Sequence, residues 1–371
     1  MFTALPPAIL APLTKGGNLP FRRLCVDFGA KVTMSEMAYA RQVVRGSRPE
    51  LALLRKHASE DCFGVQIAAT NAEEAVAAGK RAIENGAAFI DLNCGCPIHD
   101  VIKRGMGATL LQRPKALLRI VAGMKEGLDV PVTVKIRSGW KEDEINASEI
   151  AQICEEAGAS MVTLHARTRE QRYTKQADWS LVKKLVQERG IPIVGNGDVL
   201  TWHELRDRQA ESGCASVMLG RGALVKPWIF KEVVEGRTWL PTARERVEVY
   251  ARLIAHGREH FGDDAKGRKK AMFFLPWHLS FFCRWRPMPD EEFQEQAKSY
   301  PLMQTRVDRG DDLPPLESIL RDPRESVHEK IAAILWDSPD VDAMCANLEQ
   351  LAAATPAPSD DEAGEVAVAH G

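Results

Sequence analysis

The stretch Phe89-Ile-Asp-Leu-Asn-Cys-Gly-Cys-Pro-Ile-His99 decides the fold. Its apolar first half stops abruptly at Asn93, as a buried parallel strand does where it runs into a loop. Gly95 allows the backbone to approach a ligand closely, and Pro97 stiffens the turn behind it. The pattern therefore presents Asn93 and Cys96 at the carboxyl end of a strand, where β/α barrels carry their chemistry.

Short apolar runs alternate with helical patterns along the first 230 or so residues, which predicts a parallel sheet. The predicted strands cover residues 9–13, 31–35, 64–67, 89–93, 132–136, 161–165, 193–195 and 216–219. Eight strands with intervening helices are typical of an α/β fold of the TIM (β/α)8 barrel type. A doubly wound, dinucleotide-binding sheet typically has a GxGxxG turn after its first strand. Gly16-Gly17 does not match that pattern, so the barrel is favoured.

The pattern changes after the last predicted strand. A short helix is expected over 227–234 and a linker over 236–241. We predict a barrel domain over residues 1–237 and a smaller all-helical domain over 242–346, with breaks at Gly262, 287–289 and 313–315. The stretch 353–371 consists mainly of Ala, Pro, Asp and Glu, which predicts a disordered tail.

Composition sets limits on function. Apolar residues make up 45% and charged residues 27%, as in ordinary globular proteins, and the net charge of −2 excludes an overall basic coat but not a local basic patch. The eight cysteines show no disulfide or zinc-ligand spacing, so we expect reduced thiols and no metal. We find no signal peptide and no apolar run long enough for a bilayer, which predicts a cytoplasmic protein without a membrane partner.

Several predicted strands end in residues that can bind or react, and the last two are followed by glycine-rich loops. Barrels often bind phosphate with these last loops, through backbone N–H groups and an arginine fork. The set predicts a flavin mononucleotide (FMN) site with phosphate at Gly197, Gly220 and Arg221, Lys135 near the N1/O2 edge of the ring, and Gln66 on its pyrimidine part. Taken alone, Gln66 is as readily a hydrogen-bonded core amide as a flavin contact. His165 alone is more often a hydrogen-bonded strand-end histidine than a catalytic residue. The prediction of an FMN site rests on the occurrence of all these residues together.

These motifs resemble the tRNA-dihydrouridine synthases, flavin enzymes with a TIM barrel and a helical RNA-binding domain. The matching motifs, in the family's order, are 11–13, 91–97, 134–137, 164–167, 195–198 and 220–222. The segments 16–23, 169–179 and 221–230 look most like the eukaryotic branch that modifies a variable-loop uridine. The zinc-finger extension of that branch is not found in this sequence.

The resemblance implies that NADPH reduces FMN, that hydride passes from N5 to C6 of uracil, and that Cys96 supplies a proton to C5. The implied FMN contacts are Ala11, Pro12, Leu13, Gln66, Lys135, His165, Asn196, Gly197, Asp198, Gly220 and Arg221. The implied substrate contacts are Asn93, Arg137, Arg167, Arg169, Lys103 and Arg104. Further candidates for RNA contact are Arg172, Lys175, 266–270, Arg284 and Arg286.

Three positions depart from the family pattern. Leu13 replaces a common methionine, and Gly105-Met-Gly107 replaces a run of three glycines. Cys94 is an extra thiol and an alternative acid, but the Gly-Cys-Pro context favours Cys96. Trp277, Phe281, Phe282 and Trp285 recur at helical spacing, so we predict that they form the core of the helical domain.

Three other functions fit the same residues. They are an FMN oxidoreductase of a small molecule, an RNA-binding barrel that has lost catalysis, and another FMN-dependent modification of RNA. We expect a monomer with tRNA as its partner. The sequence does not define the target uridine, and it does not separate tRNA from ribosomal RNA.

Overall fold

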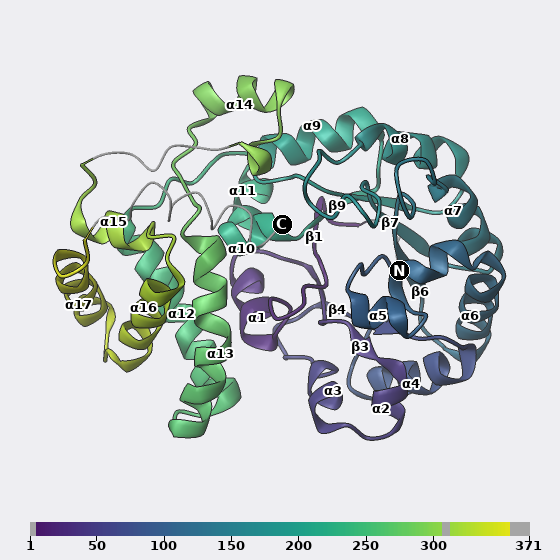
Figure 1. The fold of residues 1–371 in the computed structure, drawn as a ribbon, viewed down its shortest axis with the longest axis horizontal. Helices are drawn as coiled ribbons and strands as arrows, with labels where there is room; N and C mark the ends of the chain where they lie inside the picture. The colour runs from purple at the N-terminus through teal and green to yellow at the C-terminus, as the bar shows by residue number, and fades with distance from the viewer. Residues whose placement is uncertain (1–4, 306–311, 357–371) are drawn as a thin grey trace.

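The computed structural model describes residues 5–305 and 312–356. Its barrel strands are β1 (Ala8–Leu10), β2 (Val32–Met34), β4 (Cys62–Ala68), β5 (Phe89–Cys94), β6 (Val132–Arg137), β7 (Met161–His165), β8 (Ile193–Asn196) and β9 (Ser216–Leu219). They are parallel, in the order β1-β9-β8-β7-β6-β5-β4-β2, and β1 lies next to β2, so the strands form a nearly closed ring (Figure 1). The prediction of a TIM barrel is confirmed. A short strand, β3 (Ala38–Tyr39), pairs with the end of β4.

Helices surround the strands. They are α1 (Leu19–Asp27), α2 (Ala40–Val44), α3 (Arg48–Leu53), α4 (Ala72–Glu84), α5 (His99–Lys103), η1 (Gly107–Gln112), α6 (Pro114–Gly127), α7 (Ala147–Glu156), α8 (Trp179–Glu188), α9 (Trp202–Ser212), α10 (Arg221–Val225) and α11 (Ile229–Glu235). Local sequence sets their ends: Asn18 accepts from the N–H of Phe21 at the start of α1, and Pro114 opens α6.

The barrel interior changes character along the strands. Phe89, Met161 and Met218 belong to an apolar cluster inside the ring. Side chains two and four residues after Phe89 point to the same side, because strand residues alternate between faces. These are Asp91 and Asn93, so the interior becomes polar toward the carboxyl ends of the strands.

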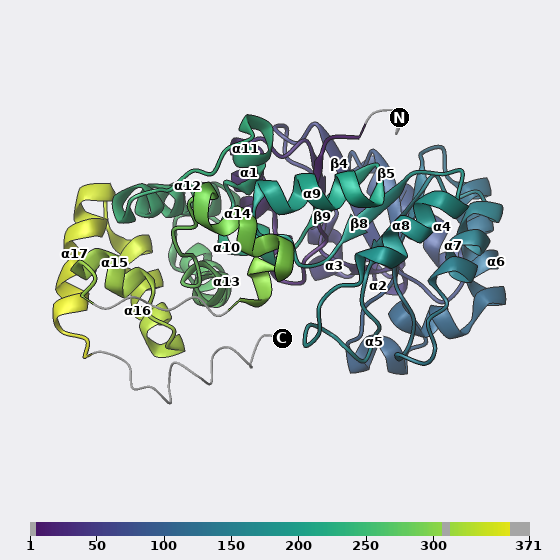
Figure 2. The same cartoon turned by 90° about the horizontal axis from the view of Figure 1, so that it is seen from above.

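A helical region follows the barrel. It consists of α12 (Ala243–Phe261), α13 (Ala265–Phe282), α14 (Asp290–Ser299), η2 (Leu302–Gln304), α15 (Pro315–Leu320), α16 (Glu325–Asp337) and α17 (Val341–Ala353). Figure 2 shows α12, α13 and α15–α17 grouped beside the barrel, with α14 near α9. Helix α12 packs on α1, and α13 packs on α10. The ring of Phe274 on α13 meets that of Phe21 on α1 with centroids 6.3 Å apart.

The structure differs from the sequence-based expectation in several short elements. Helices α2, α3 and α5 and the helix η1 lie where the sequence shows no helical periodicity, because each has only one or two turns. The first strand ends at Leu10 rather than at residue 13, and α17 runs to Ala353 rather than 346. Most of the predicted tail, residues 357–371, lies outside the described residues. The division into domains 1–237 and 242–346 stays a prediction.

Candidate active site

A cavity of about 490 Å³ opens at the carboxyl ends of the strands. Strand ends and their loops form one wall, and Trp277 and Phe281 of α13 belong to the opposite wall. A volume of this size is usual for small-molecule and cofactor sites. The cavity brings together Gln66, Asn93, Cys96, Lys135, Arg137, His165 and Arg221, together with Pro12 and Leu13.

The cavity floor is a chain of buried hydrogen bonds. Gln66 donates to Asp91 at 2.7 Å and accepts from Asn93 at 2.7 Å, and Thr133 donates to Asp91 at 2.6 Å. Burial raises the pKa of Asp91 to about 6, although the two donors lower it. Both ends of the Gln66 amide thus have a buried partner, and a flavin contact would use its remaining N–H donor or acceptor capacity. The network fixes the orientation of Asn93.

Two residues hold the loop that carries Cys96. The side-chain oxygen of Asn93 accepts from the N–H of Gly95 at 3.2 Å and of Cys96 at 2.9 Å. Arg137 donates to the carbonyl oxygen of Gly95 at 3.0 Å. Burial raises the pKa of the Cys96 thiol above its ordinary value, with Arg137 and Lys135 acting in the opposite direction. The thiol therefore keeps its proton at neutral pH, as a general acid must.

The structure separates the two close cysteines. Cys94 is the last residue of β5 and is fully buried in the main hydrophobic core, with a pKa raised well above its ordinary value by burial. Cys96 lies two residues further on, in the loop, and lines the cavity. Only Cys96 of this pair can reach a molecule bound there.

Lys135 and His165 differ in charge. The Lys135 ammonium donates to the side-chain oxygen of Asn196 at 3.0 Å, and burial lowers its pKa to about 8. Asn196 in turn donates to the carbonyl oxygen of Met218 at 2.8 Å. Burial and the neighbouring cations Arg137 and Lys135 lower the pKa of His165 well below its ordinary value, so its ring is neutral.

The loops after β8 and β9 enclose a smaller space of about 90 Å³. It is lined by Ala11, Gly197, Asp198, Gly220 and Arg221, among others. Gly197 has φ +135° and Asp198 has φ +51°, which places both in the left-handed region. A Cβ on Gly197 would lie 2.5 Å from the Cβ of Ala177, so the turn requires glycine here.

Asp198 is the centre of a buried ion-pair group. Its carboxylate accepts from Arg167 at 2.5 Å and from Arg221 at 3.3 Å, and also from Gln304 at 3.0 Å. Arg167 is fully buried and also donates to the carbonyl oxygen of Lys175 at 2.5 Å. The sequence predicts an RNA contact for Arg167. Its burial instead assigns it to holding Asp198 and the loop after β7.

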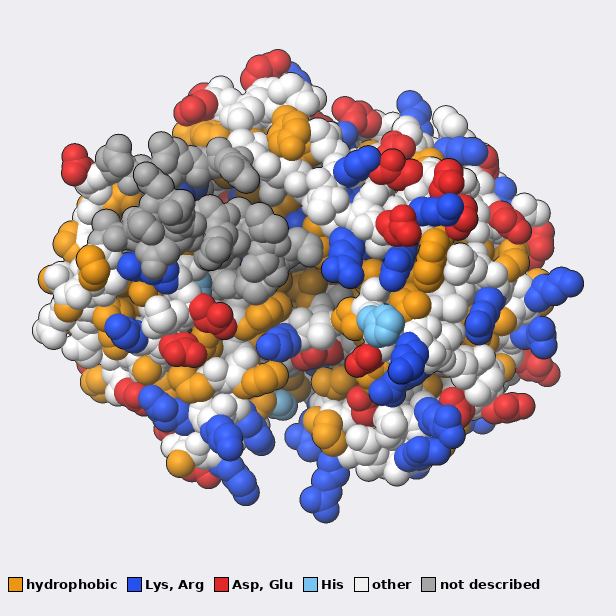
Figure 3. Space-filling view, viewed as in Figure 1, with side chains coloured by type: hydrophobic (Ala, Val, Ile, Leu, Met, Phe, Trp, Pro, Cys, Tyr) orange, Lys and Arg blue, Asp and Glu red, His pale blue; other side chains and the backbone are white. Residues whose placement is uncertain are grey.

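The other predicted RNA contacts lie around the mouth. Lys103 and Arg104 are exposed at the end of α5, and Arg172 lines the cavity. Arg169 lies over the ring of Trp140, and Lys175 pairs with Glu142. Figure 3 shows Lys and Arg side chains gathered over α5 and the neighbouring loops on this face.

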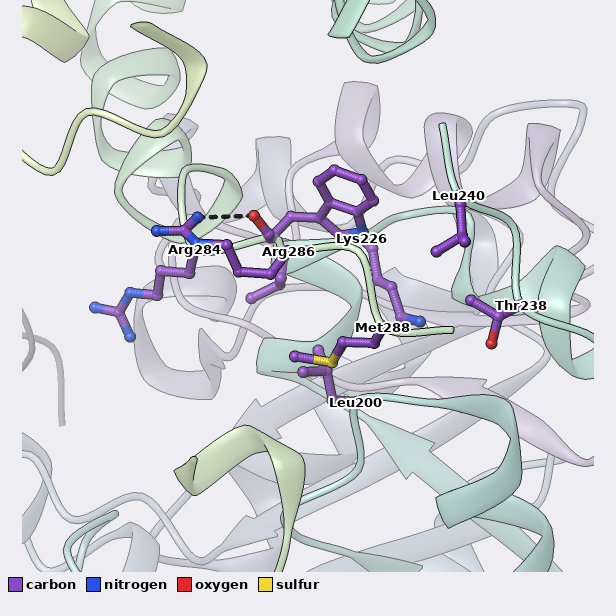
Figure 4. A pocket seen from close by; sticks show the side chains of 9 residues that line it. Leu200, Lys226, Thr238, Leu240, Arg284, Arg286 and Met288 are labelled. Carbon is purple, nitrogen blue, oxygen red and sulfur yellow. Dashed lines mark hydrogen bonds between the residues drawn. The ribbon is translucent and has the colours of Figure 1, made fainter. Parts of the chain in front are cut away.

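Arg284 and Arg286 are half-buried at the junction of α13 with the barrel. Figure 4 shows a small hollow there, between Leu200, Lys226 and Met288, in which Arg286 donates to the carbonyl oxygen of Trp285 at 2.8 Å. Its volume of about 10 Å³ admits roughly one water molecule, so it is a packing junction and not a second ligand site.

Sequence reasoning missed several side chains of the site. Tyr173 lines both cavities, and the guanidinium of Arg221 lies 4.2 Å from its ring centroid. The motif 91–97 contains Asp91, but the sequence does not indicate that this carboxyl lies under the cavity. Trp277 and Phe281 were predicted as core: Phe281 is buried as expected, but Trp277 is half-buried and both line the cavity. Their helical spacing indicates that they share one face of α13, but it does not show that this face borders the cavity.

Within residues 5–305 and 312–356, no three His, Cys, Asp or Glu side chains gather in a way that would hold a metal ion. None of the helices in that part of the chain is both long and apolar enough to cross a bilayer.

The fold and the cavity are those of a TIM-barrel protein whose site lies at the carboxyl ends of its strands. The model of the dihydrouridine synthase (Dus) family matches residues 9–305, so the chain belongs to that family. A human protein named tRNA-dihydrouridine(47) synthase (NAD(P)(+))-like is 42% identical over 283 residues, which cover 75% of this chain and 43% of the human protein. A Coprinopsis cinerea protein named tRNA-dihydrouridine(47) synthase (NAD(P)(+)) is 42% identical over 294 residues, 75% of this chain and 44% of that protein.

This chain therefore spans less than half the length of these curated relatives. Among solved structures, a 2-naphthoyl-CoA reductase complex superposes with a TM-score of 0.51 at 15% identity, over 62% of this chain and 50% of the reductase. That likeness concerns the barrel fold alone.

Proposed function

We propose that this protein reduces the C5–C6 double bond of uridine in tRNA to give dihydrouridine, with FMN as cofactor and NADPH as reductant. The observation that carries the proposal is a pair of adjoining cavities: the larger holds the Cys96 thiol, the smaller is lined by Gly197 and Gly220, and both are lined by Lys135 and Arg221. Family membership and the names of the relatives support the same reaction.

The residues present suit FMN. The smaller space offers Gly197 and Gly220, whose lack of side chains leaves backbone open to a phosphate, and Arg221 as a fork of donors. Arg221 is oriented by the ring of Tyr173 on one side and by Asp198 on the other. Lys135 lies at the junction of the two cavities and would face the ring, with Gln66 and Asn93 on the floor.

When bound, FMN supplies the hydride for C6 of the uracil after reduction by NADPH. Cys96 holds a proton on Sγ and gives it to C5, which becomes basic once C6 has gained hydride. Burial keeps the thiol protonated at the pH of the cell, and Asn93 fixes the backbone that carries it. Lys135, which is half-buried and lines both cavities, provides positive charge there.

Arg137 has a positioning role. It bonds the carbonyl oxygen of Gly95 on the Cys96 loop, and that of Thr168 at 2.8 Å on the loop after β7. One guanidinium thus ties together two loops that border the cavity. The outer cations Lys103, Arg104 and Arg169 would bind RNA phosphates, which need only clustered charge. We also propose a cytoplasmic location and a monomer.

Dihydrouridine mapping in total RNA from a strain without the protein tests the proposal. The expected result is loss of dihydrouridine at one or more tRNA positions, restored by the wild-type protein and not by a Cys96→Ala variant. The purified protein should be yellow, release FMN on denaturation and bleach with NADPH. A colourless protein that refuses FMN would overturn the proposal, and unchanged tRNA beside a flavin active on a small molecule would favour the alternative oxidoreductase.

A further inference from the structure

Helix α13 carries an aromatic row that continues out of the cavity. Phe273, Trp277 and Phe281 follow one another at intervals of four residues, so they share one helix face. Phe281 and Trp277 line the cavity, and their ring centroids are 5.1 Å apart. Phe273 lies one turn further out and is 68% exposed. We call these three residues the aromatic row.

A single exposed phenylalanine needs no explanation, because folded proteins expose many apolar side chains. This one is not isolated. Lys266, Lys269 and Lys270 precede Phe273 by seven, four and three residues and therefore lie on the same face of α13, and all three are exposed. In the described part of the chain, none of the three forms an ion pair with a carboxylate.

The loop after β1 forms the facing side of the row. Thr14 lines the cavity, the Lys15 ammonium lies 4.4 Å from the ring centroid of Phe273, and a Cβ on Gly16 would lie 3.2 Å from Trp277. Lys15 has φ +63°, an uncommon conformation for a side-chain-bearing residue. Its backbone N–H donates to the Glu36 carboxylate at 2.7 Å, which holds the loop in this shape.

Figure 3 shows a notch between the lower end of α13 and the barrel, with Lys and Arg side chains on both edges. A row of aromatic rings that runs into a cavity and has cations at its outer end matches one class of partner best. Single-stranded nucleic acid stacks its bases on such rings while cations follow its phosphates. A protein partner would have to bring carboxylates to the cationic edges and planar side chains to the rings, whereas nucleic acid carries phosphates and flat bases along one strand. A lone nucleotide would not need so long a row.

We propose that the aromatic row and Lys15 bind the unpaired RNA next to the target nucleotide, with a neighbouring base stacked on Phe273. This inference rests on the proposed function for the identity of the RNA, and it goes beyond that function by naming where the strand leaves the cavity. A base displaced from its helix must be held by its neighbours, because extrusion costs stacking energy. Stacking of a neighbouring base on Phe273 would offset part of that lost stacking energy outside the cavity.

The test uses the full FMN-loaded chain and a labelled, unmodified tRNA transcript, with affinity measured by fluorescence anisotropy at several salt concentrations. Phe273→Ala should weaken binding about 5- to 150-fold, as loss of one base–aromatic stack does, and leave the salt slope unchanged. Phe273→Tyr should bind like wild type. The matched control is Val234→Ala, which truncates an apolar side chain that is 72% exposed on α11, and it should keep wild-type affinity. A Lys266→Ala/Lys269→Ala variant should instead lower the salt slope by about two.

A second measurement locates the stacked base. A series of transcripts, each with one abasic nucleotide near the target uridine, should contain one position that weakens binding to wild type but not to Phe273→Ala. Melting temperature and flavin content of each variant report on folding and on the cofactor site.

The outcomes separate the two claims. If wild type forms dihydrouridine while Phe273→Ala binds RNA as tightly as wild type, the role of the aromatic row is overturned and the proposed function stands. If wild type binds the transcript through Phe273 but never forms dihydrouridine, the proposed function is overturned and the RNA-binding role of the aromatic row is kept. An abasic series with no Phe273-dependent position, or no RNA binding by wild type, would also overturn the row.

Discussion

The side-chain oxygen of Asn93 accepts a hydrogen bond from the backbone N–H of Cys96 at 2.9 Å. The nitrogen of the same amide donates to Gln66 at 2.7 Å. Asn93 is buried, so both ends of its amide are committed to partners in a region with little water. It joins the loop that carries the thiol to the polar floor of the barrel.

Replacing Asn93 should therefore affect catalysis through the position of Cys96. Asn93→Ala leaves buried donors and acceptors without partners, and should cost about 1–3 kcal/mol of unfolding free energy in urea. It should slow dihydrouridine formation far more than it weakens FMN binding. Asn93→Asp keeps an acceptor for the N–H of Cys96 but loses the donor to Gln66. Its rate of dihydrouridine formation should therefore lie between the rates of the wild type and of Asn93→Ala. An Asn93→Ala protein with the wild-type rate would contradict this role.

Lys135 predicts a pH dependence of FMN binding. Burial lowers its pKa to about 8, so the side chain is charged below that pH and neutral above it. An anionic ligand binds the charged form better, so binding takes up a proton and the affinity should fall as pH rises above 8, by at most about tenfold per pH unit. Lys135→Met should give weaker and nearly pH-independent binding over the same range. Flavin fluorescence titrations from pH 7 to 10 measure both, and equal slopes for the two proteins would contradict the assignment.

The buried pair of Arg167 and Asp198 predicts a large effect on stability. Arg167→Met removes the 2.5 Å partner of a buried carboxylate and should cost about 3–5 kcal/mol of unfolding free energy. The double variant Arg167→Met/Asp198→Asn should regain part of that loss. Arg237→Ala, which breaks the largely exposed pair with Glu235, is the control and should cost less than about 1 kcal/mol. Equal urea midpoints for the Arg167 and Arg237 variants would show that the buried pair contributes nothing.

The turn after β8 can be tested by a Gly→Ala substitution at Gly197, with the same substitution at Gly236, after α11, as the control. Both have positive φ, but a Cβ on Gly197 would lie 2.5 Å from Ala177, whereas a Cβ on Gly236 would have no neighbour within 4 Å. Gly236→Ala should cost about 1 kcal/mol from backbone strain alone. Gly197→Ala should cost more and should also abolish or strongly weaken FMN binding, measured by equilibrium dialysis. Retention of full FMN affinity by Gly197→Ala would argue against a phosphate at this turn.

The sequence predicted the barrel because the alternation of apolar strands and amphipathic helices is strong over more than 200 residues. It also placed Asn93 and Cys96 correctly at a strand end, since the apolar run of β5 stops there. It could not predict the burial of Arg167. Arginine is usually exposed unless it is paired, and the sequence does not show that Asp198 faces this residue in the fold. Helical spacing showed that Trp277 lies on an apolar face, but only the packing of α13 beside the barrel shows that this face borders the cavity. Tyr173 lies in a loop without periodicity, and the family-like segment 169–179 that contains it does not identify it as a site residue.

The most direct test of the account compares Cys96→Ala with Cys94→Ala in a single turnover. Each FMN-loaded protein is reduced with NADPH without oxygen and mixed with an unmodified tRNA transcript, and flavin reoxidation and dihydrouridine are followed together. Cys94→Ala should react at close to the wild-type rate, because Cys94 is buried away from the cavity. Cys96→Ala should bind FMN and be reduced normally but form dihydrouridine about 10²–10⁴ times more slowly. Dihydrouridine formation by Cys96→Ala at the wild-type rate would contradict the account.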